Sequence, residues 1–73
     1  MVRLEEQPNG WSDTRTWDAV LGSTAVGYIE LRNGQHYWHI TEHRVPVYGP
    51  HYGAGLGLYD CTNKIERALG VLV

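Results

Sequence analysis

The chain has few of the residues that stabilise many small proteins. Its 73 residues include one cysteine, Cys61, and no phenylalanine. A single cysteine excludes an intrachain disulfide and a zinc site built from several cysteines. A chain of this length buries only roughly 60–65% of the surface that its unfolded form exposes. We therefore expect a single domain, residues 1–73, stabilised by large packed side chains or by self-association.

Long apolar runs and an excess of basic residues are also missing. No stretch approaches the ~20 apolar residues that a membrane-spanning helix needs, and residues 1–6 are charged, unlike a signal peptide. These features predict a soluble, cytoplasmic protein. Six Lys and Arg residues stand against eight Asp and Glu residues. Proteins that bind nucleic acid through its phosphates are usually strongly basic, so this balance disfavours nucleic acid as a partner.

Aromatic residues are present in number, and all of them carry a polar atom. The chain holds three tryptophans and five tyrosines. Such side chains suit half-buried sheet faces and interfaces, where one end is dry and the other is wet.

Three segments alternate between apolar and polar residues, as strands do: residues 15–21, 26–31 and 36–41. Asn33-Gly34 between the last two favours a type I′ turn, which joins the strands of a tight hairpin. This turn pairs Arg32 with Gln35, which sets the register of the two strands. Along these strands, successive cross-strand pairs then alternate between the two faces of the sheet. A three-residue loop at 23–25 would then pair Leu21 with Gly27 and Ala19 with Ile29.

This register divides the sheet into two faces, because successive side chains alternate across a strand. The apolar face receives the following residues of the three strands: Trp17, Ala19, Leu21, Ile29, Leu31, Trp38 and Ile40. The polar face receives Tyr28, Glu30, Tyr37, His39 and Thr41, and we expect the first four to form one contiguous patch.

The rest of the chain completes the predicted fold. Residues 1–14 are either a short edge strand around Val2 and Leu4 or a frayed terminus. Residues 42–59, rich in Gly, Pro and Tyr, read as a long loop with a short strand around 56–59, and such loops are often functional. Residues 60–73 form a helix and an apolar tail, with Asp60 as N-cap. An apolar stripe faces the sheet, while the outer side carries four polar residues: Thr62, Asn63, Glu66 and Arg67. We predict an α+β fold in which this helix packs on one face of an antiparallel sheet of three or four strands.

Several residues of types found in metal, phosphate and catalytic sites are better explained here by structural roles. His36 and His39 should point to opposite faces, and neither these nor His43 and His51 show metal-ligand spacing, so no metal is expected. The glycines of residues 53–57 do not match a phosphate-binding loop. Cys61 lies on the apolar stripe, where a small buried residue is expected. No nucleophile is paired with a base, so we predict a protein that is not an enzyme and has no cofactor.

The β-β-β-α order, together with residues 57–69, Gly-Leu-Tyr-Asp-Cys-Thr-Asn-Lys-Ile-Glu-Arg-Ala-Leu, resembles AP2-like and phage-integrase arm-type DNA-binding domains. The likeness covers residues 15–69 and implies a sheet that enters a DNA groove. The polar face departs from that pattern, because it offers Tyr28, Glu30, Tyr37 and His39 instead of arginines and lysines. By its size, composition and tryptophan-rich hairpin, the chain also resembles the small orphan proteins that actinobacterial phages carry, many of which bind host proteins.

These observations favour a small interaction module that binds a host protein or a second copy of itself. Its predicted contact residues are those of the polar face and two tyrosines of the long loop: Tyr28, Glu30, Tyr37, His39, Tyr48 and Tyr52. Sheet-mediated DNA binding is the alternative.

Overall fold

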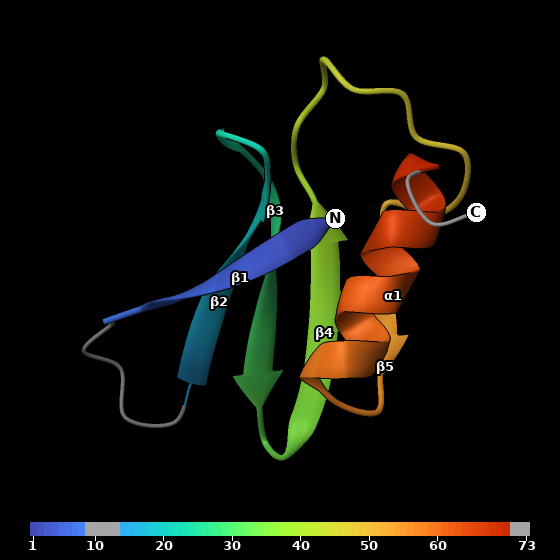
Figure 1. The fold of residues 1–73 in the computed structure, drawn as a ribbon. Helices are drawn as coiled ribbons and strands as arrows, with labels where there is room; N and C mark the ends of the chain where they lie inside the picture. Colours follow the sequence, from blue (N-terminus) through green and yellow to red (C-terminus); the bar gives the residue numbers. More distant parts are fainter. Residues whose placement is uncertain (9–13, 71–73) are drawn as a thin grey trace.

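The computed structural model describes residues 1–8 and 14–70. Along these ranges the chain forms five strands and then a helix (Figure 1): β1 (Val2–Gln7), β2 (Thr14–Leu21), β3 (Thr24–Arg32), β4 (Gln35–Ile40), β5 (Tyr52–Gly55) and α1 (Leu58–Leu69). The strands make one sheet in the order of the sequence, and every neighbouring pair is antiparallel. The α+β class is therefore confirmed, whereas the predicted three or four strands are five.

The hairpin of β3 and β4 has the predicted turn and register. Asn33 and Gly34 both have positive φ values, 53° and 77°, as a type I′ turn requires. Arg32 pairs with Gln35 across the turn, and Tyr28 pairs with His39 farther along. This turn therefore sets which side chains of the two strands share a face.

The connection between β2 and β3 differs from the prediction. Its turn is Gly22 and Ser23, so Leu21 pairs with Thr24, and a bulge then places Ala19 opposite Gly27. The predicted loop at 23–25 and its pairings were wrong, because Gly22 adopts a φ of +66° that suits a tight turn. The observed partner of Ala19 is Gly27, two residues from the predicted partner Ile29. Because side chains alternate with a period of two, this shift leaves Trp17, Ala19 and Ile29 on the same face, as predicted.

The two edge strands were the least clear from sequence. β1 confirms the edge strand expected near Val2 and Leu4, while residues 9–13 of that segment lie outside the described residues. β5 lies within the predicted loop and ends before the strand expected at 56–59. Its glycines permit close packing: a Cβ would lie 3.0 Å from the Trp38 indole at Gly53, and 2.5 Å from Cys61 Sγ at Gly55.

The helix α1 begins at Leu58, two residues before the predicted start. Its N-cap is Gly57, which offers no side-chain cap, so the prediction of Asp60 as N-cap was wrong. Asp60 instead lies in the first turn and its Oδ2 accepts a hydrogen bond from the Leu56 N–H at 2.9 Å. That bond, with help from Lys64, lowers the pKa of the Asp60 carboxyl. Gly70 ends the helix with a φ of 75°, and the predicted tail at 71–73 lies outside the described residues.

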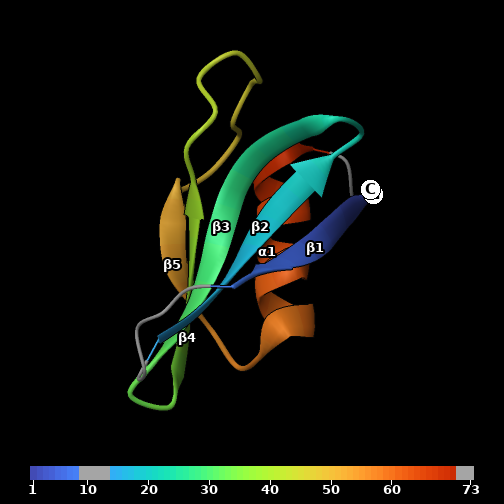
Figure 2. The same cartoon turned by 90° about the vertical axis from the view of Figure 1, so that its left-hand side faces the viewer.

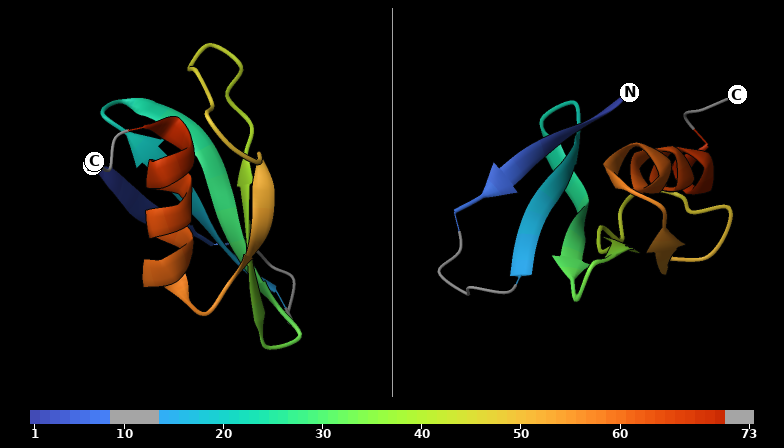
Figure 3. Two further views of the ribbon diagram at one scale, coloured as in Figure 1. Left: turned by 90° about the vertical axis from the view of Figure 1, so that its right-hand side faces the viewer. Right: turned by 90° about the horizontal axis from the view of Figure 1, so that it is seen from below.

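The sheet curls around the helix, which lies against its concave side (Figures 2 and 3). We call this side the covered face and the other side the open face. The main hydrophobic core lies between the covered face and α1, and is formed by Val2, Trp17, Ala19, Val26, Ile29, Trp38, Ile40, Cys61, Ile65, Ala68 and Leu69. In residues 1–8 and 14–70, no helix combines the length and apolar character that crossing a bilayer requires.

Glu66 is a charged residue on a buried side of the helix. It was predicted to lie on the outer side, but it is 6% exposed. Its Oε2 accepts a hydrogen bond from the Val2 N–H at 2.7 Å. The prediction failed because the curled sheet places β1 against α1 as well as β4 and β5, so that two sides of the helix are buried.

Candidate functional site on the open sheet face

The open face carries a row of polar and aromatic side chains on neighbouring strands. Strand pairing aligns Asp18 of β2 with Tyr28 of β3, Tyr28 with His39 of β4, and His39 with Tyr52 of β5. A second row lies beside it, in which Glu30 pairs with Tyr37. The register therefore places the predicted residues side by side on one face, and α1 lies against the other face of the sheet (Figure 3).

At the centre of this surface, His39 contacts two of its neighbours. Its imidazole stacks on the Tyr28 ring, with the centroids 4.5 Å apart and the planes 19° from parallel. Its Nε2 lies 3.3 Å from Glu30 Oε1, within hydrogen-bond reach. These contacts hold the three side chains half-buried and fix their orientation.

The other tyrosine of the predicted patch is covered by an arginine. The Arg32 guanidinium lies 5.0 Å from the centroid of the Tyr37 ring, the geometry of a cation–π contact. Arg32 also approaches Glu30, with 3.8 Å between Nη2 and Oε1. Glu30 therefore lies beside both His39 and Arg32 and links the two aromatic pairs into one cluster.

We call Tyr28, Glu30, Arg32, Tyr37 and His39 the aromatic cluster. Arg32 was missed as a member because it flanks the turn and was read as part of the connection. The signal was present in the alternation, since Arg32 has the same parity along β3 as Tyr28 and Glu30.

Acidic side chains surround the cluster on the β1 and β2 side. Asp18 accepts a hydrogen bond from the Gln7 amide at 2.8 Å, and Glu5 pairs with Arg3 at 3.0 Å. By strand register, these residues and the cluster share the open face, which holds three carboxylates and two arginines among residues 1–8 and 14–70. This balance does not provide the positive potential that phosphate binding requires.

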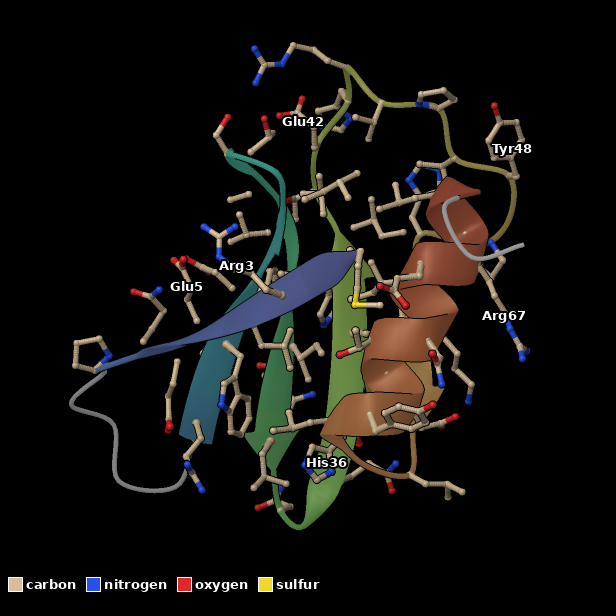
Figure 4. All side chains as sticks on the ribbon, in the orientation of Figure 1. Arg3, Glu5, His36, Glu42, Tyr48 and Arg67 are labelled. Atoms are coloured by element: carbon tan, nitrogen blue, oxygen red, sulfur yellow. The ribbon has the colours of Figure 1, made fainter. Side chains whose placement is uncertain are left out.

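The two loop tyrosines of the prediction are placed differently from each other. Tyr52 lies on β5 opposite His39 and is 71% exposed, so it extends the row of aromatic residues to the sheet edge. Tyr48 lies away from the sheet, beside the C-terminal end of α1 (Figure 4). Its N–H donates to the Ala68 carbonyl at 2.6 Å, and its ring lies against Gly70. The structure thus places Tyr52 in the row of the open face, whereas Tyr48 packs against the end of α1.

The histidines lie apart, as their alternation predicts. His36 is on the covered side, where its ring stacks on Trp17 with the centroids 6.3 Å apart, whereas His39 is on the open face. His43 and His51 are exposed on the segment that connects β4 and β5. Across residues 1–8 and 14–70, no three His, Cys, Asp or Glu side chains come together as metal ligands would.

Cys61 is buried in the core at the start of α1. It is 0% exposed, and burial raises the pKa of its thiol, with a further contribution from the charge of Asp60. A thiol in this state is a poor nucleophile. The arrangement agrees with the expected structural role of Cys61.

Comparisons with known proteins add no relative. No family model matches the chain, and no curated protein or solved structure matches it.

Proposed function

We propose that the chain is a non-enzymatic interaction module that binds a protein partner through the open face of its sheet. The observation that carries the proposal is the aromatic cluster, ordered on the face that α1 leaves uncovered. Tyrosine and arginine are enriched among the residues that dominate binding energy at protein interfaces.

Contacts within the cluster orient its side chains in the unbound protein, which favours tight binding. The Tyr28–His39 stack and the Arg32–Tyr37 contact restrict side chains that would otherwise lose rotamer freedom on binding. Such ordering costs roughly 0.5–1.5 kcal/mol for each flexible side chain at an interface. Tyr52 would widen the contact at the sheet edge, because it continues the same row and is largely exposed.

Two kinds of protein partner fit this surface. The resemblance to small phage proteins makes a host protein the first candidate, and the chain would then be a phage accessory protein. A second copy of the chain is the other, since a surface with both charges can be self-complementary.

The test removes the two tyrosine rings of the cluster together. We expect the Tyr28→Ala/Tyr37→Ala variant to fold, because both side chains lie on the open face, and to lose partner binding by about tenfold or more. Tyr59→Ala is the matched control, since Tyr59 is 83% exposed but lies on α1. Purified partner, identified by capture from the host, is titrated calorimetrically against all three proteins. Equal affinity for wild type and double variant would remove the open face from the proposal.

Self-association is measured separately by light scattering over a range of protein concentrations. A dimer that the double variant loses and Tyr59→Ala keeps would identify the second copy as the partner.

DNA binding through the same face is the alternative function, and Arg3 and Arg32 are the residues of that face that favour it. A gel shift at low salt, where phosphate contacts are strongest, tests it. No shift at micromolar protein would exclude it.

A further inference from the structure

A pocket of about 460 Å³ lies at the edge of the sheet, between β5, the end of the preceding connection and α1. This volume is in the range of small-molecule sites in proteins. Most of its lining is aromatic or apolar and comes from Trp38, Tyr48, Pro50, Tyr52, Gly53 and Ala68. Tyr28 and Tyr37 do not line it, so this pocket is distinct from the aromatic cluster, although Tyr52 borders both.

The floor of the pocket depends on Gly53. A Cβ at this position would lie 3.0 Å from Nε1 of Trp38, so the glycine leaves the indole edge uncovered by a side chain. Trp38 is 4% exposed, and in the described part of the chain its Nε1–H is a buried donor without an acceptor. Native structures rarely leave such donors unsatisfied, and this one lies beneath the pocket, where its signal reports on a ligand bound above it.

Both charged residues in the described lining of the pocket are basic. Lys64 and Arg67 of α1 line it, and within residues 1–8 and 14–70 no lining residue carries a carboxylate. Lys64 is already engaged, since its Nζ lies 3.1 Å from Asp60 Oδ2 and 3.1 Å from the Ala54 carbonyl. Arg67 extends from the helix toward solvent (Figure 4), and within residues 1–8 and 14–70 it has no side-chain hydrogen bond or salt bridge. One guanidinium at the rim is thus available for an anion.

We propose that this pocket binds a small aromatic carboxylate. The ring of the ligand lies over Trp38 and Gly53 and contacts Tyr48 and Tyr52, and its carboxylate pairs with Arg67. Arginine suits this role because its planar guanidinium can donate two parallel hydrogen bonds to a carboxylate. The apolar lining explains the preference for an aromatic body, and the lack of acidic lining residues explains the preference for an anion.

The experiment titrates the protein with 2-naphthoate and, as a matched neutral probe, 2-naphthamide. Amide spectra should show saturable naphthoate binding, with the largest shifts at the Trp38 indole N–H and at Gly53. Naphthamide should bind about tenfold more weakly or worse, because it lacks the charge that pairs with Arg67. A spectrum of Trp38→Phe assigns the indole signal.

Two variants with the same change of net charge locate the effect. Arg67→Gln should weaken naphthoate binding by about tenfold or more. Arg44→Gln removes an arginine that lies outside the pocket and pairs with Glu42, and it should bind like wild type. Wild-type-like amide spectra of both unliganded variants establish that they fold. Equal binding of the two probes, an unchanged affinity of Arg67→Gln, or shifts away from the pocket would each overturn the proposal, and none of these results bears on the Tyr28/Tyr37 test.

Discussion

The two faces of the sheet hold different aromatic residues. On the covered face, Trp17 and Trp38 are 6% and 4% exposed and pack into the core. On the open face, strand register places Tyr28, Tyr37 and Tyr52, and none of them is fully buried. A tyrosine hydroxyl stays hydrated on an open face, whereas Trp38 is buried with an N–H that has no acceptor within residues 1–8 and 14–70. The large side chains of the covered face therefore stabilise the fold, and the polar rings of the open face are the ones we propose for recognition.

The largest expected difference in stability is between substitutions at two adjacent residues, one on each face. Ile29 is 0% exposed at the centre of the covered face, so Ile29→Ala should lower the free energy of unfolding by about 2–5 kcal/mol. Glu30→Ala, one residue along on the open face, should change it by no more than about 1 kcal/mol. Urea denaturation measures both. If Ile29→Ala does not fold, Ile29→Val supplies the measurement, at about 0.5–1.5 kcal/mol. Equal losses at the two positions would contradict the division into faces.

A smaller loss is expected at the contact between α1 and β1. Glu66→Ala leaves the buried Val2 N–H without its acceptor, which should cost about 1–3 kcal/mol. Glu66→Gln retains an oxygen that can accept the bond and should cost less. Hydrogen exchange of the β1 amides distinguishes this local effect from general destabilisation. Unchanged protection of Val2 in Glu66→Ala would show that the bond does not hold β1.

Burial of Cys61 should also slow its chemical modification in the folded protein. Cys61 is buried and its thiol pKa is raised, so iodoacetamide can label it in native protein only after the protein unfolds. Labelling should therefore be slower in native protein than in urea by a factor on the order of 10³ or more. Mass spectrometry follows the labelled fraction over time. Similar rates in the two conditions would mean that the covered face opens readily.

The sequence predicted the parts of the fold that depend on local signals. Asn33-Gly34 determined the hairpin register, and with it the grouping of Tyr28, Glu30, Tyr37 and His39 on one face. The β2–β3 turn was misjudged because a bulge compensates for its shorter length, and a bulge leaves no clear mark in the alternation of residues.

The remaining features depend on contacts between segments far apart in the sequence. β5 was read as loop because its glycines are turn formers, but Gly53 and Gly55 are required by the close approach of Trp38 and Cys61. Glu66 was placed on the outer side because it lies off the apolar stripe of the helix, and the residue that buries it, Val2, is at the other end of the described chain. The position of Tyr48 beside Gly70 also follows from such packing.

The hydrogen bond between Val2 and Glu66 joins residues 64 positions apart, which has a consequence for protein synthesis. During synthesis β1 leaves the ribosome before α1, so the five described strands of the sheet can pair before the helix has emerged. Until α1 arrives, the nascent chain exposes the aliphatic and indole surface that the helix will cover, and such surface promotes aggregation. A chaperone would therefore recognise the growing chain by the face that is hidden in the finished protein, while the face proposed for partners is the one that is polar from the start.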